Sequence, residues 1–326
     1  MRTSTLLLLG LVIFCSCNTP SNTIPVIGFA DAFEDNTIAQ AKQGFFDALK
    51  KSGYSEDNNT LKVIYRNAQG DIPKLTLSIK YFISEKVTLM ATNPSLSTIA
   101  ALQNTKDIPV FMMVSPTPQL MNVMDKQNNA PANLFGVAED LGYIDTSFSL
   151  IPKFIKPFAD DTTVVRMLKV GMIYNQSEPQ SAEALQRIKA LATKLHIELV
   201  SLPVNNTADV QLVTQALLSK GIKAFFANPD NTVFSSFETI LKACNDAHVP
   251  VFTSEAGLVS RGAVAAYGAD IYQWGYQAGE QAAQFLKNKS AAGLHWEMVK
   301  LRKRVYNAAA AKQFGITVPA NFEAIK

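Results

Sequence analysis

The sequence predicts an α/β protein with two similar lobes, each built on a parallel sheet. Apolar runs of strand length alternate with longer stretches of helical periodicity along most of the chain. Such alternation is typical of parallel strands whose sheet is covered by helices on both faces. The second half of the chain repeats the plan of the first, and this duplication favours two lobes over one large sheet.

The expected elements follow from apolar periodicity and from the residues that stop it. In the first helix, Ile38, Ala41 and Phe45 lie on one stripe and Gly53 ends the pattern. In the first half, strands are expected at 25–29, 61–65, 87–91 and 109–113, and helices at 37–51, 71–84 and 95–103. In the second half, strands are expected at 168–174, 197–204, 223–227 and 250–253, and helices at 180–195, 208–219 and 232–247.

The C-terminal segment does not simply extend the second lobe. A strand-like run at 263–267 is followed by a helix at 271–287, a second strand-like run at 296–301 and a short helix at 307–314. A chain that crosses between the lobes more than once in this segment would form a hinge.

The N-terminus has the plan of a bacterial export signal. One early Arg precedes an apolar run at 6–14, which is too short to span a bilayer comfortably. The run ends at Phe14-Cys15-Ser16-Cys17, which is similar to a lipobox. We therefore expect a signal peptide at 1–16 and a tether at 17–23 lipidated on Cys17, with Cys15 as the alternative site.

Composition excludes several classes of function. The chain has 326 residues, 48% hydrophobic and 17% charged, with a formal net charge of +3, so it suits a globular monomer and gives no case for nucleic acid. The basic run at 300–304 is interpreted as a short strand or a solvated face. The three His are scattered and no phosphate-binding loop occurs, so neither a metal nor a cofactor is expected. Cys244 is expected to be a buried, inert thiol.

Polar residues collect where the predicted strands end. Because ligands of open α/β sheets bind beyond the carboxyl ends of the strands, we expect these residues to line a cleft. The candidates are Asp31, Phe33, Thr92, Ser95, Ser115, Thr117, Asn175, Asp230, Asn231 and Glu255. Most of them precede a helix, so helix capping is the alternative for each one taken singly.

The chemistry of these candidates suits a zwitterion such as an amino acid. Helix N-termini attract a carboxylate, and Asp230 is expected to hold an ammonium. No G-x-S-x-G motif is present. Asp230, Glu255 and Asp270 would have to supply acid–base catalysis without a nucleophile or a metal, so recognition is favoured over an enzymatic function.

Several segments resemble the solute-binding proteins of bacterial ABC importers, in particular the tryptophan/tyrosine substrate-binding lipoproteins. The resemblance is carried in the first half by QGFFDALKKSGY (43–54), NAQGD (67–71), IPVF (108–111) and FGVAED (135–140). In the second half it is carried by VGMIYNQSEPQS (170–181), the long segment 226–287 that contains DNTV, PVF and GADIYQWG, and KQFGITVP (312–319). It covers nearly the whole chain after the expected signal peptide.

The resemblance implies a type I periplasmic-binding-protein fold, in which two Rossmann-like lobes are joined by a hinge of three crossings. It implies a first lobe of residues 24–137 plus 268–297 and a second of 138–267 plus 298–326. It also implies that Asp270 joins the other candidates in contacting the ligand.

The function implied is that of an extracytoplasmic, membrane-anchored receptor, not an enzyme. It would close on an amino acid, aromatic in the related family, and deliver it to an ABC permease with its ATPase. The alternative is a sensor subunit that presents a small molecule to a signalling partner.

Overall fold

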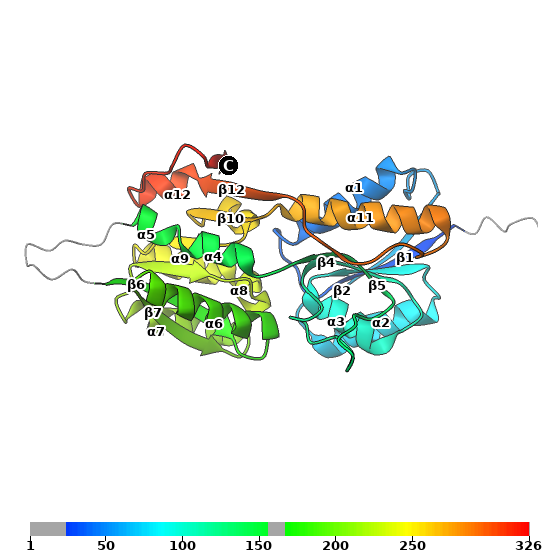
Figure 1. Ribbon diagram of the computed structural model, residues 1–326, viewed down its shortest axis with the longest axis horizontal. Helices are drawn as coiled ribbons and strands as arrows, with labels where there is room; N and C mark the ends of the chain where they lie inside the picture. Colours follow the sequence, from blue (N-terminus) through cyan, green and yellow to red (C-terminus); the bar gives the residue numbers. More distant parts are fainter. Residues whose placement is uncertain (1–23, 156–166, 326) are drawn as a thin grey trace, which may run out of the picture.

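The computed structural model describes residues 24–155 and 167–325 and consists of two lobes set side by side (Figure 1). Each lobe has helices packed on parallel strands, so the predicted α/β class with two similar lobes is confirmed. The expected signal peptide, the tether and both candidate lipidation cysteines lie outside the described residues.

The first lobe contains a six-stranded sheet in the order β11-β5-β4-β3-β1-β2. All its neighbouring strands pair in parallel. The strands are β1 (Val26–Asp31), β2 (Lys62–Asn67), β3 (Leu89–Asn93), β4 (Val110–Pro116), β5 (Leu134–Glu139) and β11 (Glu297–Met298). The helices of this lobe include α1 (Ala39–Lys51), α2 (Ile72–Ser84) and α3 (Ser95–Asn104).

The second lobe contains a parallel sheet in the order β7-β6-β8-β9 and a smaller sheet in the order β10-β12-β13. The strands are β6 (Leu168–Asn175), β7 (Ile197–Val204), β8 (Ala224–Ala227), β9 (Val251–Thr253), β10 (Ala265–Ala269), β12 (Arg302–Asn307) and β13 (Glu323–Ile325). The helices are α4 (Gly142–Phe148), α5 (Ile151–Phe154), α6 (Pro179–Lys194), η1 (Thr207–Asp209), α7 (Val210–Leu218), α8 (Asn231–Ser235), α9 (Phe237–Asp246), α10 (Ala256–Ser260) and α12 (Ala308–Gln313).

Several elements differ from the prediction. The helix expected at 232–247 is two helices, α8 and α9, because Ser236 leaves helical geometry at φ −118° and ψ 15°. The strand-like run expected at 296–301 holds only the two-residue strand β11, whereas the basic run at 300–304 falls largely in strand β12, in agreement with its interpretation as a short strand. Strands β5 and β13 and helices α4, α5 and α10 are not among the expected elements.

The chain passes between the lobes three times. It leaves the first sheet after β5, returns between β10 and helix α11 (Ile271–Asn288), and leaves again between β11 and β12. Helix α11 lies against α1 at the top of the first lobe (Figure 1). Glycines allow this close approach, because a Cβ on Gly275 would stand 1.8 Å from the carbonyl oxygen of Ala41. The packing fixes the first turn of α11 beside the junction of the lobes.

Aromatic side chains fill the core of each lobe. The rings of Phe111 and Phe135 lie 5.4 Å apart in the first lobe, and those of Phe148 and Phe226 lie 5.3 Å apart in the second. Cys244 is fully buried, as predicted, and burial raises the pKa of its thiol to about 12. Within 24–155 and 167–325, no helix combines the length and apolar character needed to cross a membrane.

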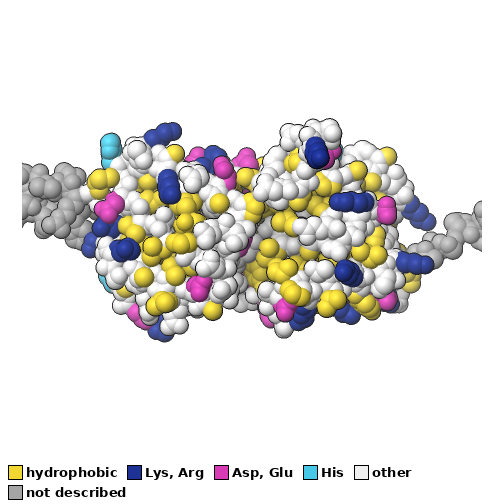
Figure 2. Space-filling view, turned by 90° about the horizontal axis from the view of Figure 1, so that it is seen from below, with side chains coloured by type: hydrophobic (Ala, Val, Ile, Leu, Met, Phe, Trp, Pro, Cys, Tyr) yellow, Lys and Arg dark blue, Asp and Glu magenta, His cyan; other side chains and the backbone are white. Residues whose placement is uncertain are grey.

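Figure 2 shows the seam between the lobes from below, with hydrophobic side chains on both lobes. Basic and acidic side chains are interspersed around them, and this face has no large patch of one charge. This face therefore lacks the continuous basic patch that is typical of a nucleic-acid-binding surface.

Candidate ligand-binding site

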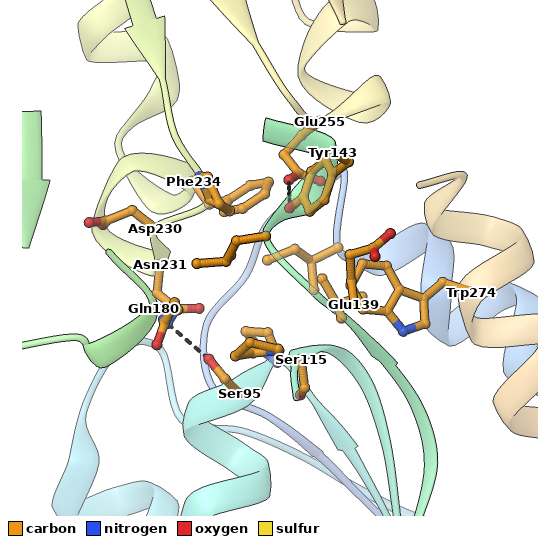
Figure 3. A pocket seen from close by; sticks show the side chains of 16 residues that line it. Ser95, Ser115, Glu139, Tyr143, Gln180, Asp230, Asn231, Phe234, Glu255 and Trp274 are labelled. Carbon is orange, nitrogen blue, oxygen red and sulfur yellow. Dashed lines mark hydrogen bonds between the residues drawn. The ribbon is translucent and has the colours of Figure 1, made fainter. Parts of the chain in front are cut away.

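A pocket lies between the two lobes and encloses about 450 Å³ of space, its opening to solvent included (Figure 3). The enclosed part is small, because the two lobes approach closely around it. Its walls come from the ends of strands in both lobes and from the crossing segments. The lining residues are Ile38, Pro94, Ser95, Val114, Ser115, Pro116, Glu139, Leu141, Tyr143, Gln180, Pro229, Asp230, Asn231, Phe234, Glu255 and Trp274.

One wall of the pocket is the N-terminus of α3 in the first lobe. Ser95 is the first residue of this ten-residue helix, and among the described residues no side chain caps the helix start. Behind it, hydroxyl groups are linked in series, with Thr98 Oγ1 lying 2.9 Å from Thr92 Oγ1 and 3.1 Å from Ser115 Oγ. The N–H of Ser97 already donates to the carbonyl oxygen of Pro94 at 3.0 Å. The N–H groups of Ser95 and Leu96, the helix dipole and the nearby hydroxyls make this wall suited to a carboxylate.

The opposite part of the pocket holds a buried carboxyl group, Glu255, at the end of β9. The Tyr143 hydroxyl donates a 2.5 Å hydrogen bond to Oε1 of Glu255, and Ser254 Oγ donates to the same atom over 3.3 Å. Burial raises the pKa of Glu255 to about 7, although both hydrogen bonds oppose that shift. The group is therefore poised to ionise near neutral pH.

A second carboxyl group, Glu139, lines the pocket at the end of β5. Arg302 holds it with two bonds, from Nε to Oε2 at 2.8 Å and from Nη2 to Oε1 at 2.5 Å. Burial raises the pKa of Glu139 to about 7 against the opposing effect of Arg302. No Lys, Arg or His is among the described residues that line the pocket, so its ionisable lining favours a cationic group.

Apolar and aromatic side chains complete the lining. Phe234 projects from α8 in the second lobe, and Trp274 projects from the first turn of α11 (Figure 3). The Trp274 indole is fixed because its Nε1 donates a 2.8 Å hydrogen bond to the carbonyl oxygen of Val137. Tyr143 adds a third ring, so the pocket offers planar surfaces for an apolar or aromatic side chain.

The structure corrects the role expected of Asp230. Asp230 lines the pocket, but its carboxylate points away from the pocket centre (Figure 3). The carboxylate accepts hydrogen bonds from Asn175 N at 2.7 Å, Ser181 Oγ at 2.5 Å and Val233 N at 3.0 Å. It therefore caps α8 and ties α8 to β6, which is the alternative reading of a carboxylate before a helix. The other carboxyl groups in the lining are Glu139, which pairs with Arg302, and Glu255, which accepts from two hydroxyls.

Asn231 connects the two lobes directly. Its Nδ2 donates to Ser95 Oγ at 3.2 Å across the pocket and to Glu178 Oε2 at 2.6 Å within its own lobe. Burial and the neighbouring charge of Asp230 raise the pKa of Glu178. The amide thus joins the start of α3 to a buried carboxyl group at the start of α6.

The structure brings together five of the predicted site residues and leaves six outside the lining. Those that line the pocket are Ser95, Ser115, Asp230, Asn231 and Glu255. Those outside it are Asp31, Phe33, Thr92, Thr117, Asn175 and Asp270.

Most of the six residues outside the lining take part in ion pairs, a helix cap, buried hydrogen-bond networks or core packing. Asp31 accepts from Asn93 Nδ2 at 2.9 Å and pairs with Lys42 at 3.5 Å. Asp270 caps α11 and pairs with Lys303 at 2.7 Å. Thr92 and Asn175 are buried in hydrogen-bond networks behind the lining, Phe33 is buried in the first-lobe core, and Thr117 follows β4 without reaching the pocket.

Sequence reasoning missed Glu139, Tyr143, Gln180, Phe234 and Trp274. A signal was present for four of them, since the segments that carry the resemblance contain Glu139 (FGVAED), Gln180 (VGMIYNQSEPQS), and Phe234 and Trp274 (226–287). Strand-end reasoning missed Glu139 because β5, the strand that it ends, was not among the expected elements. Within the described part of the chain, no cluster of three or more His, Cys, Asp or Glu side chains is arranged to hold a metal ion.

Comparison with known proteins gives consistent matches. A family model described as ABC transporter substrate binding protein matches residues 26–325. The tyrosine-binding protein of Clostridioides difficile is 31% identical over 268 residues, covering 82% of this chain and 74% of that protein.

Solved structures resemble the whole two-lobed arrangement. A conserved domain protein from Vibrio cholerae superposes with a TM-score of 0.82 at 28% identity, covering 93% of this chain and 100% of that one. An ABC domain from Streptococcus pneumoniae in complex with L-Trp superposes with a TM-score of 0.80 at 23% identity, covering 91% and 96% of the two chains. The latter likeness is one of fold.

Proposed function

Because the chain belongs to the family of ABC transporter substrate-binding proteins, we propose that it captures an amino acid between its lobes and delivers it to an ABC permease and its ATPase. Its fold is that of the two-lobed type I periplasmic binding proteins, as the resemblance predicted. The observation that carries the proposal is the pairing, in one pocket, of an uncapped helix N-terminus with two buried carboxyl groups.

The two kinds of wall assign an orientation to the ligand. Its carboxylate is placed at the start of α3, near Ser95 and Ser115, where N–H groups and hydroxyls can donate. Its ammonium is placed at Glu139 and Glu255. Its side chain is placed against Phe234 and the other aromatic residues of the lining. An aromatic amino acid suits this surface, and the tyrosine-binding relative supports that choice.

Closure of the lobes is the proposed capture step. The moving units are the lobes divided at the three crossings, at residues 140–141, 270 and 299–301. Lobe closure would exclude water from the carboxylate and ammonium contacts and so strengthen them. The closed protein is proposed to act as a monomer.

The binding proposal is tested by calorimetry with L-tyrosine, L-tryptophan and two analogues of tyrosine. Tyramine lacks the carboxylate, and 3-(4-hydroxyphenyl)propanoate lacks the ammonium, so each tests one wall of the pocket. We expect both analogues to bind at least a hundredfold more weakly than the better of the two amino acids. Absence of binding to a full panel of L-amino acids would remove the proposal, and equal binding of tyramine would remove the role of α3.

The proposed location is the outer face of a bacterial cell membrane, held by lipid on Cys17. The sequence around Cys17, which lies outside the described residues, supports this part of the proposal. Incorporation of a labelled fatty acid in the producing cell should be lost in Cys17→Ala and retained in Cys15→Ala. The reverse result would assign the anchor to Cys15.

A further inference from the structure

Arg261, which follows α10 in the second lobe, extends to the first lobe at a place outside the pocket lining. Its Nη1 pairs with Asp35 Oδ2 and donates to Thr37 Oγ1 at 3.2 Å, both in the segment between β1 and α1. This contact joins residues 226 positions apart in the chain.

The same guanidinium is anchored within its own lobe. Nε and Nη2 donate to Glu238 at 2.8 and 2.7 Å, and Nη2 also donates to the carbonyl oxygen of Phe234 at 3.3 Å. The group lies 5.1 Å from the ring centre of Phe237. These partners orient the planar guanidinium so that its remaining nitrogen, Nη1, points to Asp35. Arg261 is thus held by the second lobe and reaches the first.

Asp35 transmits this contact to the pocket wall. Its other oxygen, Oδ1, accepts from Thr37 N and Ile38 N at 2.9 Å each, and Ile38 lines the pocket. On the other side, Phe234 is the pocket residue whose carbonyl oxygen Arg261 binds. One guanidinium therefore connects a pocket residue of each lobe without touching the pocket itself.

The lobes approach closely at this contact. A Cβ on Gly257 would stand 2.0 Å from Cγ2 of Thr37, so the two surfaces are already at packing distance. The Asp35 side chain is 1% exposed and that of Arg261 is 13% exposed, whereas Glu238 is 68% exposed. If the lobes separate, Arg261 keeps its solvated partner Glu238 and loses its buried partner Asp35. The Arg261–Asp35 pair consequently stabilises the closed arrangement of the lobes and contributes nothing to the separated one.

We propose that Arg261 is a positioning residue for ligand capture, and that its pair with Asp35 latches the closed lobes and slows ligand release. The proposal rests on the proposed function, in which the lobes close on an amino acid. It assigns to Arg261 an effect on the dissociation rate without any contact to the ligand. Closure follows encounter, so the association rate should change little.

The test compares Arg261→Met and Asp35→Asn with the unmodified protein in stopped-flow binding of L-tyrosine and L-tryptophan. Met keeps the stem that packs on Phe237, and Asn keeps an oxygen to cap Thr37 and Ile38. We expect dissociation at least fivefold faster in each variant, association within twofold of the unmodified protein, and no further acceleration when the two changes are combined. Arg187→Met is the matched control, because Arg187 forms a two-bond pair with Asp145 at 2.8 and 3.0 Å inside the second lobe.

A second measurement keeps the latch testable if neither amino acid binds. Small-angle X-ray scattering of the ligand-free proteins should give a larger radius of gyration for Arg261→Met and Asp35→Asn than for Arg187→Met. Unchanged dissociation rates in variants that bind would overturn the latch. Failure of the unmodified protein to bind any amino acid would overturn the proposed function, and the scattering comparison would then decide the latch by itself. An unchanged radius of gyration in that case would overturn it too.

Discussion

The Tyr143 hydroxyl donates a 2.5 Å hydrogen bond to Oε1 of Glu255, and this bond joins α4, just after the first crossing, to the end of β9 in the same lobe. Both side chains are buried, and the charge of nearby Glu139 further raises the pKa of Glu255. One end of the pocket therefore holds two carboxyl groups whose ionisation is opposed by burial. A bound ammonium would reverse that balance by favouring the charged forms.

Tyr143→Phe should weaken binding of L-tyrosine about tenfold at pH 7.5, the size expected for loss of one buried hydrogen bond to a carboxylate. The substitution leaves the ring in the lining but removes the donor that helps Glu255 to ionise. Calorimetry measures the change. Tyr272→Phe is the control, because its hydroxyl binds Asp47 at 2.9 Å on the surface of the first lobe. Equal affinities of Tyr143→Phe and the control would contradict the role given to this bond.

Ligand binding should strengthen as the pH rises from about 6 to 8. Glu139 and Glu255 have pKa values raised to about 7, so both are largely protonated at pH 6 and ionised at pH 8. Because an ammonium favours the ionised forms, binding at pH 7 should release protons. Calorimetry in buffers of different ionisation enthalpy measures that release. Proton uptake on binding would contradict the assignment of the ammonium to these carboxyl groups.

The ligand-free protein should show the opposite pH dependence in its stability. Unfolded glutamates ionise near pH 4.3, so between that value and about 7 the folded state holds more protons than the unfolded state at Glu139 and Glu255. The stability that these two glutamates contribute is therefore fully present below the unfolded pKa and is lost as the pH rises through the folded pKa of about 7.

The melting temperature of the ligand-free protein should accordingly fall between pH 5 and pH 8. Glu255→Gln should flatten that fall, because the amide does not titrate and can still accept the bond from Tyr143. Scanning calorimetry at four pH values is sufficient. A melting temperature that rises over this range would contradict the shifts at both groups.

Strand-end reasoning predicted the part of the site that a single lobe determines. Ser95 and Glu255 each follow a parallel strand and Ser115 is the penultimate residue of β4, so topology alone places them at the same edge of their sheets. Glu139 ends parallel strand β5, which was not among the expected elements. Trp274 reaches the pocket from a crossing, and its position depends on how the chain returns between lobes. No local pattern encodes that return; the packing of α11 on α1 does.

The direction of a side chain was the other feature that the sequence left open. A carboxylate before a helix suits either a cap or a ligand, and the two roles of Asp230 differ only in where the oxygens point. Three donors within its own lobe decide the matter. Two of them, Asn175 N and Ser181 Oγ, come from distant parts of the sequence.

Asp230→Ala should therefore lower the free energy of unfolding by about 1–3 kcal/mol, because it leaves buried donors at Asn175, Ser181 and Val233 without their acceptor. Asp230→Asn keeps one oxygen for the cap and should bind L-tyrosine within about threefold of the unmodified protein. Urea unfolding and calorimetry measure the two effects. A hundredfold loss of affinity in Asp230→Asn, with stability retained, would restore the ammonium role to Asp230.

The contact between α1 and α11 leaves no room for a larger side chain at Gly275, the residue next to Trp274. A methyl group on Gly275 would stand 1.8 Å from the backbone oxygen of Ala41, and backbone atoms cannot move aside as a flexible side chain can. Gly275→Ala should therefore destabilise the first lobe by about 1–3 kcal/mol. It should also weaken ligand binding, because Trp274 is the adjacent residue and lines the pocket. Urea unfolding and tryptophan fluorescence report the two changes, with Gln284→Ala on α11 as the control. Unfolding at the same urea concentration as the control would show that α11 shifts to accept the methyl group.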